Sequence, residues 1–504
     1  MKTGVIVFVV LYEVITIALV MILLARQNKK KGNQDESFAL GGRSLGTWAI
    51  GTTMCLTLLG SGHLTGTWEG SLSLGATQIW HVMANGFAMA LGAYTIYRWA
   101  RRMRITTTGE IATKLYCSEL AVLIAAVNIA VCWAVTSFET QALGIIINSL
   151  TGIPLKITVL VAAVIGYCYC VFGGTKQVAM LNIINVVILY VGMFGALIFV
   201  IAKLPGHNFS SVADYYASRP AEYPNFLLFT GGKEHFLNVG IPILIAPFFA
   251  HISGQQTIQT AASAKSEKAL KRIAWFVGPM NVIIGAISIC LAMTARQMPE
   301  FAAFDNKLVT TQMLLSLIPP WFIAILFAAF VAALLSSFGG FLMGPSTAIT
   351  VDFIKRFYKK DMTEKQEANY IRLFITIGAV ICCIMAQTLP TIVVMFTWIY
   401  SFMIPVALLF IFGMWWKRNA KVGVLTFVIS WIVATFWTFG TSILEKAHLE
   451  NIHVSYVIIV TSLLVLIVGN LVSKDSKPGY FKSKEWYDSE EYRIYCEEKA
   501  RGDA

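Results

Sequence analysis

Apolar stretches of roughly 20 residues recur along nearly the whole chain, and this pattern constrains the fold more than any other feature. A helix of that length crosses about 30 Å of hydrocarbon. Of the 504 residues, 13% are charged, about half the fraction usual in a soluble domain. Because lipid offers backbone groups no hydrogen-bond partner, the spanning segments must be helices. The sequence therefore predicts an all-α polytopic membrane protein.

We predict about thirteen transmembrane helices. They begin near Val5, Leu45, Ala76, Leu120, Leu155, Val178, Val239, Ile273, Pro319, Leu373, Thr391, Val422 and Val454. The first apolar run is too long for a signal-peptide core and is read as a retained helix. The nine cysteines have neither zinc-site nor redox spacing, which indicates small buried hydrophobic residues.

The basic residues fix the expected orientation. If the N-terminus lies outside, 31 of the 39 lysines and arginines fall in cytoplasmic segments, as the positive-inside rule requires. One missed crossing would invert every later loop, so this asymmetry supports the helix count. The net charge of +12 then faces an anionic leaflet, and no nucleic-acid partner is needed to explain it. We expect a multi-pass plasma-membrane protein with a cytoplasmic C-terminus.

Two of the predicted spans carry helix-breaking residues. The second contains "LGSGHLTG" with Gly60 and Gly62, and the seventh contains Pro242, Pro247 and Gly254. Proline removes a backbone donor and glycine weakens helical preference, so both spans are expected to unwind partway. Irregular backbone at membrane depth survives only where it lines a cavity or is buried in protein. The alternative is that glycine and proline are simply common in membrane helices.

The two interrupted spans are five apart, which indicates two consecutive five-helix units of opposite orientation. Such a pair is typical of a transporter with its site near the midplane. The predicted regions are an extra N-terminal helix (1–26), the first repeat (45–203), an extracellular loop (204–238), the second repeat (239–415), two C-terminal helices (420–473) and a cytoplasmic tail (474–504).

The ninth span carries Ala333, Ser336 and Ser337 on one helical face. Two hydroxyls, together with a carbonyl freed by a local distortion of the helix, would offer neutral oxygens to a small hard cation. The alternative is close helix packing, in which each serine bonds back to its own helix. Spacing alone does not decide between these readings.

Several short stretches together resemble the sodium:solute symporter family, which includes sodium/proline, sodium/sialic-acid and sodium/sugar symporters. The matching stretches are "FALGGRSLG" (38–46), "TTGEIATKLY" (107–116), "FGGTKQV" (172–178), "QTIQTAASAKSEKALKR" (256–272), "AALLSS" (332–337) and "GMWWKRNAKVG" (413–423). Their order over roughly 380 residues carries the resemblance, since each stretch is weak alone.

The resemblance implies a leucine-transporter-like inverted repeat with a sodium site between the second and ninth spans. Carried onto this chain, the Na⁺ ligands are the carbonyls of Thr57, Gly60 and Ala333 and the hydroxyls of Ser336 and Ser337. The chain departs from the family pattern at Leu59, where a polar residue is common. It departs again at Asn182, where an aspartate is common, so we expect one sodium ion per cycle.

The expected solute site lies between the two interrupted helices. Its candidate residues are Ser61, His63, Trp68, Glu69, Glu139, Phe248, His251, Gln255 and Trp398. Glu69 and Glu139 stand out because acids within spans are costly and tend to be functional, while no lysine or arginine lies in the middle of a span. A zwitterionic or cationic amine fits this imbalance. Alternatively, Glu69 lies in water near the outer interface and Glu139 is protonated or hydrogen-bonded.

These features predict a secondary active transporter, and not an enzyme, that couples sodium entry to uptake of a small organic solute. A proton-coupled symporter, a solute sensor and a passive channel are the alternatives. No paired-carboxylate, nucleophile or P-loop motif appears. A monomer is expected to suffice for transport. The loop 204–238 is expected either over the outer vestibule or as plain surface, and the tail is expected to form a short cytoplasmic or interfacial helix.

Overall fold

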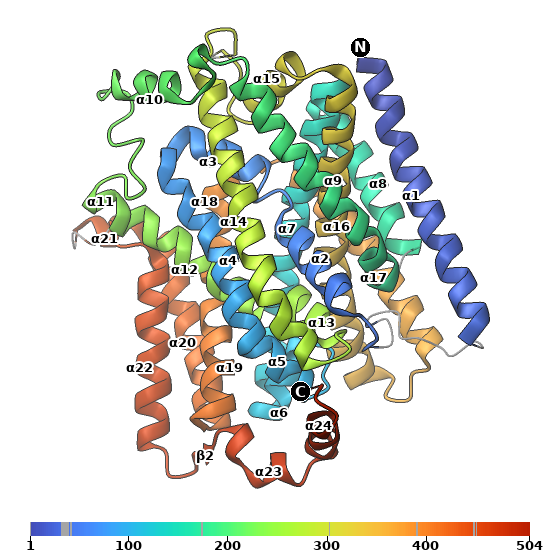
Figure 1. Cartoon of the computed structure of the whole chain (residues 1–504). Coiled ribbons are helices and arrows are strands. Elements are labelled where there is room, and N and C mark those ends of the chain that lie inside the picture. The colour runs from blue at the N-terminus through green and yellow to red at the C-terminus, as the bar shows by residue number, and fades with distance from the viewer. Residues whose placement is uncertain are drawn as a thin grey trace.

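The computed structural model describes residues 2–31, 40, 43–172, 175–301, 303–389, 392–446, 449 and 451–503. Long helices run between the two ends of one bundle, and the chain termini lie at opposite ends (Figure 1). A helix or a pair of helices occupies each of the thirteen predicted positions. In chain order these are α1 (Lys2–Lys31), α2 with α3 (Thr47–Leu58, Thr65–Leu74), α4 with α5 (Ile79–Tyr94, Ile96–Arg102), α7 (Ser118–Thr151), α8 (Leu155–Phe172), α9 (Thr175–Ile201), α12 with α13 (Ile241–Ser253, Gln255–Ala262), α14 (Glu267–Gln297), α16 (Pro320–Ala348), α17 (Glu364–Ala386), α18 with α19 (Ile392–Ser401, Ile404–Trp415), α20 (Ala420–Phe439) and α22 (Val454–Val472).

Ten spans in the described part of the chain are long and apolar enough to cross a membrane. The second, third and fifth predicted spans are not among these ten. The second is interrupted between α2 and α3, α4 has 16 residues before α5 continues it, and α8 has 18 residues, of which Leu155–Val171 have described side chains. The shorter connecting elements are η2 (Gly75–Gln78), α6 (Thr108–Leu115), η3 (Pro205–His207), α10 (Ser210–Ala217), α11 (Lys233–His235), η4 (Phe236–Gly240), α15 (Val309–Leu317), η5 (Ile349–Tyr358), α21 (Thr441–Lys446), β1 (Lys417–Arg418), β2 (Lys477–Pro478), η6 (Tyr480–Lys482), α23 (Lys484–Tyr487) and α24 (Glu490–Ala500).

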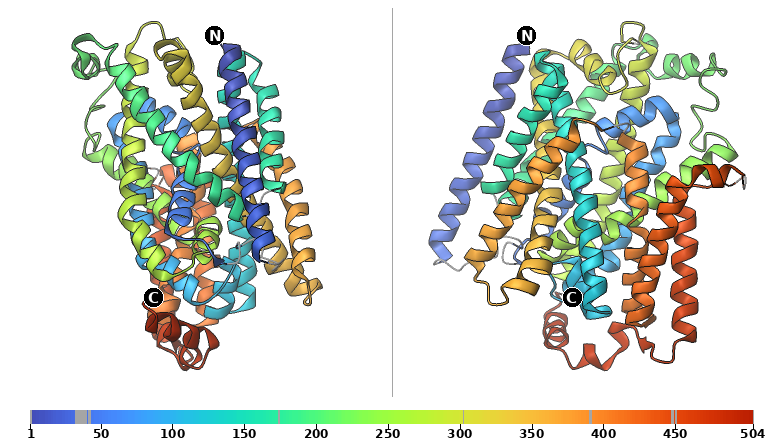
Figure 2. Two further views of the ribbon diagram at one scale, coloured as in Figure 1. Left: turned by 45° about the vertical axis from the view of Figure 1, so that its right-hand side comes forward. Right: turned by 180° about the vertical axis from the view of Figure 1, so that it is seen from behind.

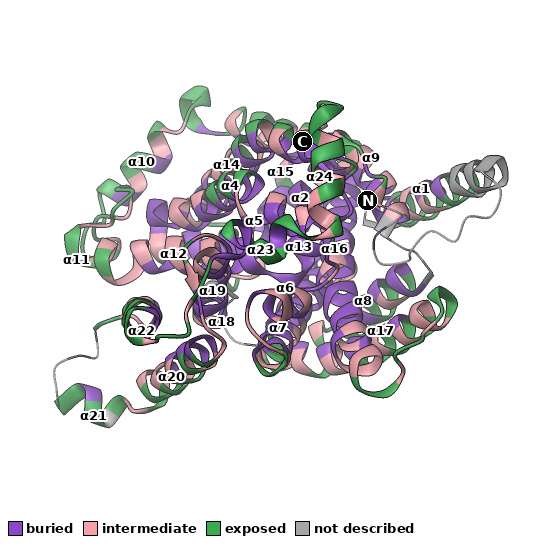
Figure 3. Cartoon of the chain, turned by 90° about the horizontal axis from the view of Figure 1, so that it is seen from below, coloured by how far each residue is buried: buried purple, intermediate pink, exposed green. Residues whose placement is uncertain are grey.

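Helix α16 lies at the centre of the bundle. In its most apolar window 94% of the residues are buried, against 22% in α1, and the view along the bundle shows buried residues gathered around α16, α2 and α13 (Figure 3). Ser336 and Ser337 are fully buried on this helix. Burying a hydroxyl costs free energy unless it is hydrogen-bonded, so serines in the most enclosed span require a polar partner.

The structure confirms the predicted interruption of the second span. In the seventh span it places the interruption at Gly254. Helix α12 runs through Pro242 and Pro247, and the chain becomes extended only at Gly254, with φ −70° and ψ 143°. The expectation of unwinding at the prolines is therefore wrong. Pro242 lies in the first helical turn, where no backbone donor is needed. The expected distortion of the ninth span is also wrong, since α16 is helical throughout and includes Pro345.

The loop 204–238 packs against the end of the bundle at which α1 begins, where α10 lies beside α14 (Figures 1 and 2). Tyr216 stacks on Phe226, and its hydroxyl donates to the carbonyl of Met293 in α14 at 2.9 Å. The N–H of Ala76 donates to the carbonyl of Phe226 at 2.9 Å. The loop is therefore tied to α14 and to η2, which follows α3.

The tail packs against the end of the bundle opposite the start of α1, and it includes the short helix α24. Strand β2 pairs with β1 in antiparallel register, and α24 brings carboxylates to basic side chains of α5 and α6. Arg101 pairs with Glu498 at 2.7 Å, and Lys114 pairs with Glu491 at 2.6 Å. These pairs join the tail to α5 and α6.

Arg418 is the most buried basic group of the tail contact, at 4% exposed. Its guanidinium donates to the carbonyls of Pro478 and Lys114 and to the carboxylate of Glu485. The hydrogen bond from Arg418 lowers the pKa of Glu485 below its ordinary value of 4.5. Arg418 thereby joins the tail to the end of α6.

We predict that Arg418→Gln weakens the tail contact by about 2 kcal/mol, because hydrogen bonds to charged groups contribute about 1.5–3 kcal/mol each. Since the folded-state pKa of Glu485 is depressed, its share of this stability is complete above pH 4.5 and is lost as the pH falls through the lowered pKa. Melting temperatures of wild type and variant should differ at pH 7 and converge in acid. Lys446→Gln, at an exposed position away from the tail, is the control, and an equal gap at every pH would contradict the assignment.

Candidate functional site

Residues 59–64 separate α2 from α3 and form an irregular segment buried within the bundle. Helix α2 ends there with carbonyls that lack the usual helical partners, which gives this end a partial negative charge. Helix α3 begins just beyond, so its N–H groups give the same segment a partial positive charge on the other side. One short stretch of backbone thus presents acceptors toward one neighbour and donors toward another.

The acceptor side faces α16. The hydroxyl of Ser337 donates to the carbonyls of Leu56 and Thr57 at 2.9 and 3.1 Å. The hydroxyl of Ser336 is buried and has no hydrogen-bond partner in the described structure. It lines a cavity of about 30 Å³ together with Thr57 and Gly340. Ser337 therefore bonds to the end of α2, and Ser336 shares a cavity with Thr57 of the same helix.

The donor side faces α7. The carboxylate of Glu139 accepts from the backbone N–H of Ser61 at 2.9 and 3.0 Å and from the Ser61 hydroxyl at 2.9 Å. This buried acid is thus held by the irregular segment, four residues before α3 begins at Thr65. It is also hydrogen-bonded, which is one of the alternatives that the sequence left open.

Gly60 lies between these two contacts and allows both. A Cβ atom at this position would fall 2.3 Å from the Ser337 hydroxyl oxygen and 2.4 Å from a carboxylate oxygen of Glu139. No real side chain approaches so closely, so only glycine lets α16, the interrupted segment and α7 meet. Gly60 is therefore required by packing.

A second small cavity, of about 20 Å³, lies on the far side of the interrupted segment. Its walls come from both repeats and from α18. The lining residues are Thr57, Leu58, Gly62, His63, His81, Asn85, Val135, Glu139, His251, Phe341, Phe396 and Tyr400. Ring centroids of Phe138 and Phe396 lie 4.7 Å apart, and those of Phe396 and Tyr400 lie 5.2 Å apart. Aromatic rings thus close a polar chamber that has room for about one water molecule.

Four predicted solute residues meet at this chamber. His63, Glu139 and His251 line it, and Ser61 holds Glu139. The binding role of each stays a prediction, while their proximity is now established.

The other five predicted solute residues lie outside the lining of the chamber. Trp68 packs edge-on against Phe330 of α16, and Glu69 is buried one residue further along α3. The side chain of Gln255 accepts from the N–H and hydroxyl of Thr108. These residues are close to the interruptions in sequence, but their side chains do not line the chamber.

The two remaining aromatic candidates also point elsewhere. Phe248 packs against Phe249 on α12. The indole N–H of Trp398 donates to the hydroxyl of Thr438 on α20 at 3.0 Å. Phe396 and Tyr400, on the same helix as Trp398, face the chamber instead.

Sequence reasoning missed His81, Asn85, Phe396 and Tyr400. His81 and Asn85 are four residues apart in an apolar span, hence on one helical face, and polar residues inside spans are costly. That signal was present in "WHVMAN". It was overlooked because α4 has no interruption to draw attention to it.

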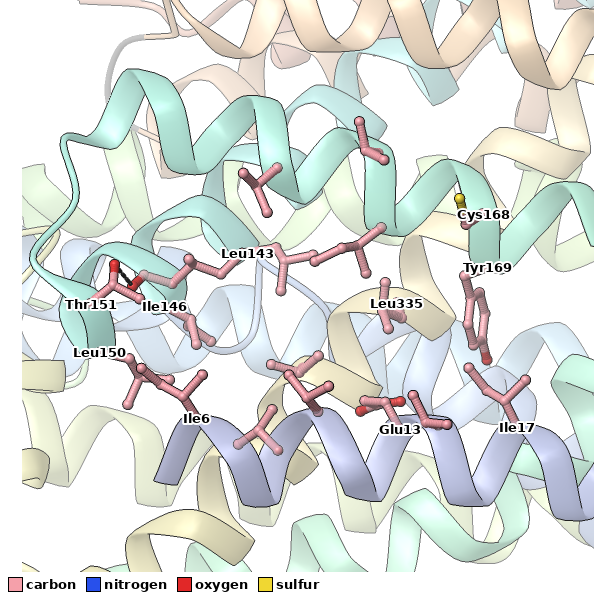
Figure 4. Close-up of a pocket in the computed structure, with 18 of the residues that line it drawn as sticks. Ile6, Glu13, Ile17, Leu143, Ile146, Leu150, Thr151, Cys168, Tyr169 and Leu335 are labelled. Carbon is pink, nitrogen blue, oxygen red and sulfur yellow. Dashed lines mark hydrogen bonds between the residues drawn. The ribbon is translucent and has the colours of Figure 1, made fainter. Parts of the chain in front are cut away.

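The largest cavity described, about 780 Å³, is not this site. It lies between α1 and helices α7, α8 and α16, and its lining is almost entirely aliphatic. Glu13 points into it from α1, across from Tyr169 of α8 (Figure 4). Because exposed residues of α1 and α8 flank it, this cavity faces the lipid side of the bundle.

A family model described as the sodium:solute symporter family matches residues 38–430. The chain belongs to that family. Its sequence is 25% identical over 494 residues to a sodium/proline symporter of Staphylococcus aureus, with 92% of each chain covered. It is 23% identical over 432 residues to a sodium/glucose cotransporter of Vibrio parahaemolyticus, covering 80% of this chain and 79% of the relative. It is 23% identical over 409 residues to a human high affinity choline transporter, covering 77% and 68%.

Solved structures show the same fold. A Na⁺-coupled sialic acid symporter in a substrate-bound outward-open state aligns with a TM-score of 0.75 and 18% identity, covering 94% of this chain and 99% of that one. Mhp1, a nucleobase-cation-symport-1 family transporter, aligns with a TM-score of 0.52 and 12% identity, covering 86% and 93%. The chain is thus a multi-pass membrane protein with the leucine-transporter-like fold, and its family is one of sodium-coupled solute transporters.

We predict that Gly60→Ala lowers the melting temperature and the free energy of unfolding, since overpacking a dense core costs about 1–3 kcal/mol or more. Gly339→Ala is the matched control on α16. Its added Cβ would have its nearest neighbour at 3.5 Å, an ordinary contact, and a helical alanine is favoured over glycine. Equal effects of the two substitutions would contradict the packing account.

Proposed function

We propose that this chain is a secondary active transporter that couples inward sodium flow to uptake of a small organic solute by alternating access. The observation that carries the proposal is the buried pair Ser336 and Ser337 facing the carbonyl end of α2. Membership of the sodium:solute symporter family and the shared fold support sodium-coupled solute uptake.

The proposed sodium ligands are the carbonyls of Thr57, Gly60 and Ala333 and the hydroxyls of Ser336 and Ser337. Hard cations prefer such oxygen ligands, and the negative end of α2 favours positive charge. The Ser336 hydroxyl, which has no partner among the described residues, suits this role. The residues present therefore fit a sodium ion.

The proposed cycle follows from which helices the ion joins. Sodium bound between α2 and α16 favours the outward-open state and orders the chamber beside it. Solute binding then selects an occluded state, and inward rocking separates α16 from α2 and releases the ion. The membrane potential supplies about 2.3 kcal/mol per charge per 100 mV, before any sodium gradient.

The proposed solute is a zwitterionic or cationic amine. Glu139 brings an acid to the chamber, and neither lysine nor arginine lines it among the described residues. The relatives alone do not identify the solute, because they include proteins named for proline, choline and glucose. The acid of this chain favours the nitrogen-bearing solutes.

Other finer features of the proposal come from the sequence. They are an extracellular N-terminus and cytoplasmic C-terminus in the plasma membrane, repeats over 45–203 and 239–415, and transport by a monomer. The gathering of α5, α6 and the tail at one end of the bundle (Figure 1) supports this orientation, because α5 carries three basic residues, α6 carries Lys114 and the tail carries seven.

We predict that Ser336→Ala with Ser337→Ala reduces sodium-dependent solute accumulation in proteoliposomes by at least about tenfold, since lost oxygen ligands cost more than 1.4 kcal/mol. Ser430→Ala, a buried serine bonded to Ser462, is the control and should keep accumulation. Equal sodium dependence in the double variant and wild type would refute the sodium site. Accumulation driven by a proton gradient without sodium would favour the proton-coupled alternative, and equilibration without accumulation would favour a channel.

We predict that uptake rises with sodium concentration with a Hill slope near one. Asn182 donates to the hydroxyl of Thr53 at 3.3 Å, and its amide supplies no negative charge for a further ion. Initial uptake rates at stepped sodium concentrations measure the slope. A value clearly near two would contradict single-ion coupling.

A further inference from the structure

We propose that the chamber beside the interrupted helix selects solutes whose cationic nitrogen carries N–H groups, and discriminates against their fully N-methylated analogues. The proposal rests on the proposed transport function and specifies the substrate class of the same site. It follows from the kinds of polar atom that the chamber presents.

Asn85 supplies a hydrogen-bond acceptor. Its amide nitrogen lies 3.0 Å from Nδ1 of His63 and donates to the carbonyl of His81 at 3.4 Å. Because a carbonyl oxygen accepts only, the atom facing it must be the amide NH₂, which fixes the orientation of the side chain. The Asn85 Oδ1 atom has no partner in the described structure, and Asn85 is 1% exposed.

Two histidines add buried nitrogens without partners. Nδ1 of His81 and Nδ1 of His251 have none among the described residues, and both side chains are at most 4% exposed. A neutral imidazole has one nitrogen that accepts. His63 already uses one of its own to accept from Asn85. Each of the other two rings has one accepting nitrogen and one N–H group, and its tautomer decides which of them lies at Nδ1.

Glu139 sets the charge. A carboxylate accepts only, with about four lone-pair positions, and Ser61 supplies two donors to it. Lysine and arginine are absent from the described lining. A solute carboxylate placed here would face Glu139 with no cation between them, whereas a cationic nitrogen would complete the acid's hydrogen bonds and balance its charge.

The enclosing rings explain why N–H groups matter beyond charge. Phe396 and Tyr400 pack around a space of about 20 Å³, so each added methyl group must displace a ring. A trimethylated nitrogen also has no donor and leaves the Asn85 oxygen unpaired. One unpaired buried acceptor lowers affinity by about tenfold or more.

The test uses the purified full-length protein in detergent, with melting temperatures followed in sodium chloride and in potassium chloride. The probes are matched pairs that differ only in methylation of the nitrogen: ethanolamine with choline, glycine with betaine, and 4-aminobutyrate with its trimethylated analogue. We expect at least one primary amine to stabilise the protein in sodium and to bind at least tenfold more tightly than its trimethylated partner. Tighter or equal binding of the trimethylated partners, or no response to any amine, overturns the proposal.

Substitutions at one position separate recognition from packing. Asn85→Leu removes the acceptor at similar volume and should bring the ratio of affinities within a pair toward one, whereas Asn85→Asp keeps an acceptor and should keep the preference. Asn470→Leu, at a buried asparagine of α22 remote from the chamber, is the control. A folded Asn85→Leu protein with the full preference overturns the role of Asn85. If that variant does not fold, loss of the preference in Asn85→Asp overturns it.

A separate measurement, with sodium and no solute, tests the proposed sodium coupling. A rise in melting temperature with sodium alone, lost in the Ser336→Ala and Ser337→Ala double variant, reports on the ion site. Sodium-dependent stabilisation by a sugar with no response to amines would leave sodium coupling intact and refute only the amine selectivity.

Discussion

The close approach of three helices at Gly60 is the contact on which the rest of the site depends. Helix α16 places the Ser337 hydroxyl against the last turn of α2, on one side of Gly60. Helix α7 places the Glu139 carboxylate against Ser61 in the same short stretch of irregular backbone. Opposite ends of two half-helix dipoles meet in that stretch, so acceptors and donors are separated by only a few residues. An ion and a charged solute can thus be recognised side by side without basic side chains in the core.

The arrangement also explains where polar residues are tolerated in so apolar a chain. Ser337 bonds to the end of α2, and Glu139 bonds to the start of the segment leading into α3. Each therefore satisfies backbone groups that the interruption leaves without helical partners. Among the buried polar atoms without a partner, the Ser336 hydroxyl and the Asn85 oxygen belong to residues that line the two small cavities.

How much the sequence predicts depends on the kind of signal. Apolar length located the spans, because crossing hydrocarbon leaves little choice of structure. Glycine at positions 60 and 254 marked the interruptions, but Pro242 and Pro247 did not, because the helical run Lys233–Ser253 continues through both prolines. The sequence predicted some residues of the chamber and missed others. Periodicity shows which residues share a face, yet it does not show which face of α4 or α18 turns toward another span, so His81 and Phe396 were missed while Trp398 was included.

The folded-back tail bears on how the molecule is completed. Arg101, Lys114 and Arg418 precede Glu498, Glu491 and Glu485 by 397, 377 and 67 residues. During synthesis these cations must therefore stay in water or at lipid headgroups until the tail has been made. This end of the bundle acquires its ion pairs only after every membrane-spanning helix has been synthesised, so its completion depends on an electrostatic step that comes late in folding.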